Sequence, residues 1–356
     1  MVGDGWRWVA NELKPLLQTL PWLLTSTEQF VDQLRAVRLS GGETLARIDI
    51  KEFFMSGTAD LICLWLSKML DQDSPRHALL MRAVRWYLEN QYIISAYVDG
   101  CWKVQQGTGM GLVPSSVVAD LTLAALGDRH SMQPGARIAF GILQYWRFRD
   151  DILVLFAAGH KVAPWYRQFR SRCSPIFKTQ LMEISSEEVT FLAVKVFRIG
   201  NRLHSKPRER EVGLPLSHES GHPPGVLLSW PVGYAYSLRR LCTRDYDLKC
   251  CYREFDQRLL EAGYPPWLIM KFVDKRQREQ SARPKPDTAC VEHWCVLPWH
   301  PLWREPTARK QIQSFLQDPA WQNVLSRAWC DTPGMHLAKL SFKKFASDHL
   351  SEIGRR

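Results

Sequence analysis

Two adjacent acids, Asp150 and Asp151, interrupt the apolar run of residues 144–156. Strands disfavour Asp, so this pair between aromatic and β-branched residues predicts a hairpin whose turn presents two carboxylates. A third acid, Asp49, ends a similar apolar stretch at residues 45–50. Brought together, three carboxylates would form a site for two divalent ions, which stabilise the attacking and leaving oxygens in nucleotidyl transfer. The alternative for the Asp150–Asp151 pair is a solvated turn, because Asp favours turns.

The composition predicts a large folded chain with a polyanionic partner. A length of 356 residues allows two or three packed subdomains, and 46% apolar with 23% charged residues argues against disorder. The formal net charge of +11 favours nucleic acid over anionic lipid. The sequence has no uncharged apolar run of 18 residues and no secretory-signal pattern, so no membrane partner is expected. Nine cysteines, an odd number, indicate reduced thiols and an intracellular location, in cytosol or nucleus.

Apolar periodicity and turn residues predict the order of the elements. The predicted helices cover residues 6–40, 58–71, 75–90, 160–173 and 231–262. A hairpin is predicted around Asp99-Gly100 and a single strand over residues 190–197. The glycine-rich loop of residues 105–111 precedes a helix that we expect a serine at 115 or 116 to cap. Residues 205–225 and 276–286 have the composition of linkers.

Phe54 and the glycine-rich loop each allow two interpretations. Phe54 lies five residues after Asp49, where a bulky ring can pack under the sugar of a nucleotide and exclude a 2′-hydroxyl. The alternative is a core phenylalanine beside a solvated acid. The loop Gly-Thr-Gly-Met-Gly matches the dinucleotide-binding fingerprint poorly, whereas close backbone approach to a base pair or template strand explains its small residues equally well.

The order of these features resembles that of a known family. An acid with an aromatic at +5, then Gln-Gly-x-Gly-Met-Gly-x-x-Pro-Ser, then Phe-x-Asp-Asp between strands is similar to palm motifs A, B and C of a reverse transcriptase. The resemblance is to the Penelope-like retroelement group and extends along most of the chain. It includes residues 13–17, 28–34, 179–197 (motifs D and E), 204–207, 220–224, 239–242, 262–265 and 296–301.

This resemblance implies an α+β right-hand polymerase with an antiparallel palm sheet, partial fingers and a helical thumb. The implied domains are partial fingers with upstream helices at 1–45 and a palm at 46–204 that carries a fingers insertion at 58–104. A linker and thumb follow at 205–275, and an extension follows at 276–356. The implied activity is RNA-directed DNA polymerisation by a nuclear enzyme, with an RNA template, a DNA primer, dNTPs and two Mg²⁺ ions, for which Mn²⁺ could substitute.

The resemblance also implies residue roles. Asp49, Asp150 and Asp151 become the catalytic and metal-binding acids, and Phe54 becomes the sugar gate. Gln106, Gly107 and Gly111 would contact the nascent pair and template, while Lys178 would donate a proton to pyrophosphate. Arg239, Arg240 and Arg244 lie off the apolar stripe of the predicted thumb helix, where they can meet duplex phosphates. The alternative for these arginines is a solvated basic face.

Three departures from the family pattern bear on this expectation. Only about 45 residues precede motif A, so the fingers segment that holds the triphosphate is expected to be incomplete. Arg149 stands where a small or apolar residue usually precedes the acids, and could pair with a catalytic carboxylate or contact the primer. Nothing after Lys339 resembles a GIY-YIG endonuclease.

Two rival functions and one further metal site remain open at this stage. A catalytically silent nucleic-acid-binding remnant would keep the basic groove without turnover. An RNA-synthesising polymerase would be expected to carry a polar residue at position 54. A zinc site is the less favoured interpretation of a tightly spaced group, Cys290, His293, Cys295 and His300. The oligomeric state has no sequence signal.

Overall fold

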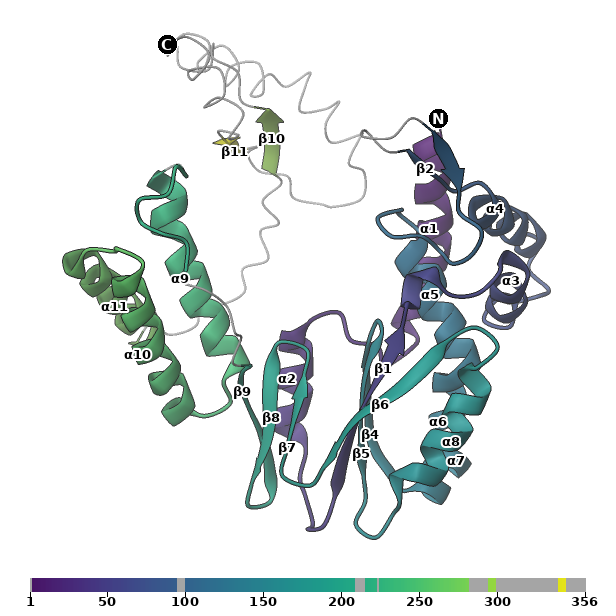
Figure 1. Ribbon diagram of the computed structural model, residues 1–356, viewed down its shortest axis with the longest axis horizontal. Helices are drawn as coiled ribbons and strands as arrows, with labels where there is room; N and C mark the ends of the chain where they lie inside the picture. The colour runs from purple at the N-terminus through teal and green to yellow at the C-terminus, as the bar shows by residue number, and fades with distance from the viewer. Residues whose placement is uncertain are drawn as a thin grey trace. The chain divides into compact units, whose positions relative to one another are not determined.

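The computed structural model describes residues 2–94, 100–208, 215–222, 224–281, 294–298 and 339–343 (Figure 1). The chain forms two compact units. Unit 1 comprises residues 1–213 and 235–255, and unit 2 comprises residues 214–234 and 256–356. Helices and mainly antiparallel strands confirm the predicted α+β class. None of the helices within the described ranges has the length and apolar character of a membrane span.

Unit 1 is built on a four-stranded antiparallel sheet in the order β4-β5-β1-β6. Its inner strands are β1 (Thr44–Lys51) and β5 (Asp151–Phe156), and its outer strands are β4 (Ile142–Phe148) and β6 (Lys178–Ser185). Neighbouring side chains of a strand point to opposite faces. Both inner strands therefore present apolar residues to two separate cores, one on each face of this central sheet.

Helices cover one face of the central sheet, against Ile48, Ile152 and Val154. Figure 1 shows α5 to α8 running along this side of the strands. The helix α8 is amphipathic, because Val162, Trp165, Phe169 and Cys173 recur at helical spacing and are buried. The helices of this unit's helical layer are α1 (Val2–Gln18), α3 (Ala59–Ser67), α4 (His77–Glu89), α5 (Ser115–Leu123), a π-helical turn (Ala124–Asp128), α6 (Arg129–Ser131), α7 (Pro134–Phe140) and α8 (Val162–Cys173).

The opposite face packs on α2 (Thr27–Ala36) and a three-stranded antiparallel sheet. The ring of Phe30 lies edge-on to Trp146 and Phe191, with centroids 5.3 Å and 4.8 Å away. Ser26 caps α2, since its side chain accepts from the backbone N–H of Gln29. The three strands are β7 (Glu188–Phe191), β8 (Val194–Ile199) and β9 (Arg202–Pro207).

The remaining elements are a short ribbon and the helices of the second half. β2 (Tyr92–Ile94) pairs antiparallel with β3 (Cys101–Lys103), as the hairpin pattern predicted; Asp99 lies outside the described residues. In unit 2 the indole N–H of Trp230 donates to the Tyr264 hydroxyl at 2.8 Å. The other elements are α9 (Pro224–Leu241), α10 (Asp245–Glu261), α11 (Pro266–Ser281), β10 (Trp294–Pro298) and β11 (Lys339–Lys343).

Two element predictions were wrong because a turn interrupts the pattern. Residues 190–197 form parts of two strands, since Leu192 adopts a left-handed φ of 52° and reverses the chain. Residues 231–262 form two helices rather than one. Between them, the Thr243 amide donates to the Ser205 carbonyl and its hydroxyl accepts from the Ser205 amide, so β9 holds the break.

Two further predictions need correction. The predicted linker at 205–225 begins inside β9, whose strand ends at Pro207. Serine does not cap α5, because Pro114 occupies the N-cap and Ser115 is the first helical residue. The Ser115 hydroxyl instead donates to the Thr108 carbonyl at 2.8 Å and meets the Tyr87 hydroxyl at 2.8 Å. The serine therefore ties the glycine-rich loop to the helix that follows it.

Candidate functional site

The three predicted acids meet at one end of the central sheet. Asp49 on β1 lies directly opposite Asp151 on β5, and directly opposed antiparallel residues have Cα atoms about 4.5–5.5 Å apart. Asp150 lies in the turn before β5, and its carbonyl accepts from the Ile50 amide at 3.1 Å. We call the two strands β4 and β5 with this turn the acid hairpin. The predicted hairpin and the convergence of Asp49 on it are both present.

Two basic residues that the sequence analysis missed contact these acids. The Arg47 guanidinium binds the Asp151 carboxylate at 2.9 Å, and the Lys51 ammonium binds the Asp49 carboxylate at 2.7 Å. Both carboxylates stay partly open to solvent, with side-chain exposures of 24% for Asp151 and 20% for Asp49. The sequence contains a pattern that predicts these contacts: residues 47, 49 and 51 alternate along β1 and therefore share one face.

The environment of Asp150 disfavours its charge. Burial raises the pKa of the Asp150 carboxyl above its ordinary value, and the negative charges of Asp151, Asp49 and Asp120 raise it further. Like charges within a few ångströms disfavour ionisation of one another unless cations compensate them. The acid end of the sheet therefore favours added positive charge.

The donors at this end suit a hard cation. Carboxylate oxygens are the ligands that Mg²⁺ prefers, and Mg²⁺ usually takes one or two protein carboxylates and completes its shell with water and phosphate oxygens. Within the described ranges, no group of three or more His, Cys, Asp or Glu side chains is arranged to hold a metal ion by itself. The residues present fit an ion held by two acids and a substrate, and do not form a closed structural metal site.

Phe54 and the glycine-rich loop come together beside the acid end. Phe53 and Phe54 lie in a 3₁₀ turn two residues after β1, where Phe53 is buried and Phe54 is partly exposed. The Phe54 carbonyl accepts from the amides of Thr108 at 2.8 Å and Gly109 at 3.2 Å. The loop is therefore fixed to the segment that follows Asp49 by backbone hydrogen bonds.

The three loop residues that were predicted to bind substrate differ in burial. Gly107 is buried at φ +86°, and a Cβ there would meet the Phe54 carbonyl oxygen and lie 2.6 Å from the Cα of Met55. Gly111 has a similar φ of +85° but open space around it, and Gln106 is exposed. Only Gly107 thus has a packing reason to be glycine, while Gln106 and Gly111 are free to meet a ligand.

Lys178 opens β6 directly opposite Lys51 of β1 and is exposed. Asp49 faces Gln180 in the same register, so the two lysines lie at the edge of the acid end.

Arg239 and Arg240 are exposed near the end of α9. The apolar stripe was predicted at Tyr234, Ala235, Leu238, Leu241 and Cys242: Ala235, Leu238 and Cys242 are buried and Leu241 is partly buried, whereas Tyr234 is exposed. Arg240 lies over the Tyr236 ring at 5.7 Å. Arg244 lies 5.8 Å from the Tyr246 ring and 3.6 Å from the Asp247 carboxylate. The first two arginines thus present charge to solvent, whereas Arg244 is half-buried and has an acidic partner.

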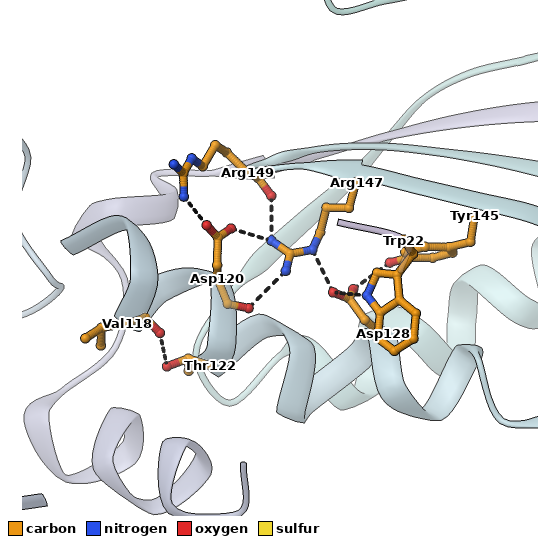
Figure 2. A network of polar contacts seen from close by, with 8 residues as sticks. All are labelled: Trp22, Val118, Asp120, Thr122, Asp128, Tyr145, Arg147 and Arg149. Carbon is orange, nitrogen blue, oxygen red and sulfur yellow. Dashed lines mark hydrogen bonds and ion pairs between the residues drawn. The ribbon is translucent and has the colours of Figure 1, made fainter. Parts of the chain in front are cut away.

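A buried charge cluster lies behind the acid hairpin on the helical side of the sheet (Figure 2). Arg147 of β4 is fully buried and binds the carboxylates of Asp120 at 2.7 Å and Asp128 at 2.6 Å. Asp128 also accepts from the Tyr145 hydroxyl at 2.6 Å and from the Trp22 indole at 3.2 Å. Although burial acts to lower it, the two carboxylates raise the pKa of Arg147, which keeps its charge.

The π-helical turn explains how one arginine reaches both acids. In a regular α-helix, positions eight residues apart lie about 80° apart around the axis. The turn at Ala124–Asp128 contains an additional residue, which rotates Asp128 back toward the face that carries Asp120. Arg149 also binds Asp120, a carboxylate outside the predicted catalytic set, so the predicted pairing of Arg149 with a catalytic acid was wrong, while its contact with primer stays a prediction.

The predicted zinc group lies outside the region where side chains are described. Cys290, His293 and His300 are not described, and Cys295 is placed only as part of β10. Cys63, Cys101, Cys173, Cys242, Cys250 and Cys251 are free thiols.

Comparisons with known proteins were made with both sequence and structure. No family model matches the sequence, and no curated protein matches it. Telomerase from Candida albicans, in complex with a TWJ fragment of telomeric RNA, is similar in structure with a TM-score of 0.50 and 13% identity, over 78% of this chain and 50% of that chain.

Other solved structures score lower. Telomerase from Candida tropicalis, in complex with a TWJ fragment of telomeric RNA, gives a TM-score of 0.47 and 10% identity, over 79% of this chain and 47% of that chain. An RNA-dependent RNA polymerase (vp4, dsRNA) gives 0.42 and 13%, over 55% and 20%. This chain spans about half the length of these telomerase chains. Its fold is similar to that of the Candida albicans telomerase.

Proposed function

We propose that this chain is an RNA-directed DNA polymerase of the Penelope-like retroelement type, which extends a primer 3′-hydroxyl with dNTPs on an RNA template. The observation that carries the proposal is the meeting of Asp49 with the acid hairpin at the sheet end beside the Phe54 segment and its glycine loop. The fold shared with a telomerase supports it. In this assignment the central sheet is the palm, residues 58–104 belong to the fingers, and α9 and α10 begin the thumb.

The acids would serve as ligands rather than as bases. Asp49 and Asp150 would hold two Mg²⁺ ions, with Asp151 beside them, and Mn²⁺ could substitute. When bound, such an ion pair supplies charge stabilisation to the attacking and leaving oxygens. Arg47 and Lys51 neutralise Asp151 and Asp49, so their pairs must open or shift when the acids take up another cation. Rigid strands beneath the carboxylates keep them in a common orientation.

Substrate selection would follow from Phe54. The residue is partly exposed and its backbone is held by the glycine loop, so its ring would project from an anchored segment and exclude a 2′-hydroxyl. Gln106 and Gly111 are exposed in the same loop and would face the nascent pair and template. Lys178 would donate a proton to pyrophosphate, since it is exposed at the edge of the acid end.

The basic residues would hold the polyanionic partners. Exposed Arg239 and Arg240 would contact phosphates of the template–primer duplex, with Arg244 beside them. The overall charge of +11 favours such a partner electrostatically, and we place the protein in the nucleus, where a DNA primer is present.

Primer extension with oligo(dT) on poly(rA) tests the proposal. We expect metal-dependent dTTP incorporation that falls at least 100-fold in Asp150→Asn, because the isosteric amide removes a charged ligand. The matched control is Glu187→Gln, which neutralises an exposed acid on the turn before β7 and should leave incorporation unchanged. Equal rates in wild type and Asp150→Asn would refute the catalytic assignment.

The two rival functions predict different results in the same assay. A silent remnant would bind the template–primer with salt-sensitive affinity and incorporate nothing at any Mg²⁺ or Mn²⁺ concentration. An RNA-synthesising polymerase would prefer rNTPs. For the proposed enzyme, Phe54→Ala should relax discrimination against rNTPs by at least tenfold, and unchanged selectivity would contradict the sugar-gate assignment.

A further inference from the structure

The turn that carries Asp150 has an unfavourable residue in its first position. β4 ends at Phe148 and β5 begins at Asp151, and these two residues are direct partners, so Arg149 and Asp150 alone make the turn. Arg149 adopts φ +56°, a left-handed conformation that glycine or asparagine adopts far more readily than a long side chain. Contacts elsewhere must therefore stabilise this arginine in the turn.

Two contacts hold Arg149 from behind the sheet. Its carbonyl accepts from the Arg147 guanidinium at 3.1 Å, and its own guanidinium binds the Asp120 carboxylate. Figure 2 shows Asp120 between the two arginines, with Arg147 continuing to Asp128 on the other side. Both the backbone and the side chain of the turn residue are thus tied to the buried cluster.

Arg149 adds a second positive charge to the buried cluster. Asp120 and Asp128 are essentially fully buried, and Arg147 is the single fully buried cation that they share. Arg149 supplies the second positive charge from the edge of the cluster, with its side chain 37% exposed. A buried carboxylate without a compensating charge is strongly unfavourable, so Asp120 holds Arg149 firmly in this position.

Asp120 also connects the turn to the glycine loop. It lies in α5, the helix that begins just after the loop and whose first residue, Ser115, bonds to Thr108 of that loop. The helix therefore contacts the loop through its first turn and the Asp150 turn through its second. Asp120 and Arg149 can therefore affect the position of Asp150 relative to the glycine loop without contacting substrate.

We propose that Asp120 and Arg149 are positioning residues that set the orientation of Asp150 relative to the glycine loop through their ion pair. This inference rests on the proposed function for its consequence in catalysis, because a displacement of about 1 Å in a reacting group can lower a rate about 100-fold. Its structural part, the restraint of the Asp150 turn, does not depend on the activity.

Arg149→Gly is the principal test, since glycine accepts the left-handed turn and removes only the side-chain contact. We expect kcat for dTTP incorporation to fall at least tenfold, with KM for dTTP and Kd for the template–primer within twofold of wild type. Arg149→Lys keeps the charge and should recover part of the lost kcat. Arg202→Gly, at an exposed arginine after the β8–β9 turn, should leave all three constants unchanged.

Hydrogen exchange of the Ile50 amide supplies a readout independent of activity, because this amide donates to the Asp150 carbonyl. Its exchange should accelerate at least tenfold in Arg149→Gly and remain at the wild-type rate in Arg202→Gly. Asp120→Asn, Arg149→Gly and the double variant Asp120→Asn/Arg149→Gly test whether the two residues act through one ion pair. The free energy of unfolding lost in the double variant should then be close to that lost in the worse single variant, and well below the sum of the two single losses.

The outcomes separate this inference from the proposed function. Wild-type kcat together with wild-type Ile50 exchange in Arg149→Gly would overturn the positioning role. An inactive wild type would overturn the proposed function, and the exchange measurement alone would then decide whether Arg149 restrains the turn. Additive losses of stability in the double variant would show that the two residues act independently, which also contradicts the proposal.

Discussion

The ion pairs at the acid end of the central sheet differ from those of the cluster behind it chiefly in exposure to water. Asp49 and Asp151 are about one-fifth exposed and each binds one flexible basic side chain, Lys51 or Arg47. Asp120 and Asp128 are essentially fully buried around Arg147. Exposed pairs contribute little to stability and open readily, whereas breaking a buried pair leaves an uncompensated charge. The same chemistry thus gives an exchangeable site in one region and a fixed support in the other.

The largest expected effect is on the buried side. Arg147→Met should lower the free energy of unfolding by about 3–5 kcal/mol, because both aspartates would remain buried without their shared cation. Urea denaturation followed by circular dichroism measures this. The control is Arg85→Met, which removes an arginine paired with Asp60 and Glu89 at the surface and should lower stability by less than about 1 kcal/mol. Equal losses in the two variants would contradict the comparison.

Two glycines extend the comparison from charge to packing. Gly107 and Gly111 share nearly the same φ, so substitution by alanine strains both backbones by about 1–2 kcal/mol. Gly107→Ala also forces a Cβ into the Phe54 backbone, which should raise its total loss by roughly a further 1–3 kcal/mol. Thermal unfolding of the two variants measures the difference. Losses within 0.5 kcal/mol of each other, a margin of about the size of additivity errors, would show that the loop contact to Phe54 is dispensable.

The local parts of this architecture were predictable from the sequence, and the buried cluster was not. Alternating apolar residues, an acid pair and turn-forming residues are local signals, so β1 and the acid hairpin could be predicted from them, whereas the convergence of Asp49 on the hairpin followed from the family resemblance. Arg147 meets Asp120 and Asp128 across 27 and 19 residues, and no local pattern announces that contact. The departure at Arg149 was visible in the sequence, but its partner Asp120 could be identified only from the position of α5 behind the hairpin.

At the acid end of the central sheet, removal of a basic side chain should change Mg²⁺ binding more than it changes stability. Arg47→Ala and Lys51→Ala should each lower the free energy of unfolding by less than about 1 kcal/mol. Because each variant frees a carboxylate from a competing cation, the Mg²⁺ concentration that gives half-maximal incorporation should fall about two- to fivefold. Denaturation and an Mg²⁺ series in the primer-extension assay test both statements. A loss of about 3 kcal/mol in the free energy of unfolding in either variant would show that these ion pairs stabilise the fold as much as the buried pairs around Arg147 do.

The smallest expected effect concerns two thiols in contrasting settings. Burial raises the pKa of Cys63 to about 11, whereas Cys101 is exposed on β3. At pH 8 only about 0.1% of Cys63 is then thiolate, the form that reacts with alkylating reagents. Iodoacetamide labelling of the native protein, followed by mass spectrometry, should therefore modify Cys101 well before Cys63. Since the folded pKa of Cys63 lies above that of the unfolded chain, its contribution to stability is complete below about pH 8 and declines as pH rises toward 11. Cys63 labelling as fast as that of Cys101 would show that α3 opens rapidly. It would also show that this part of the helical layer opens more readily than the region around Arg147.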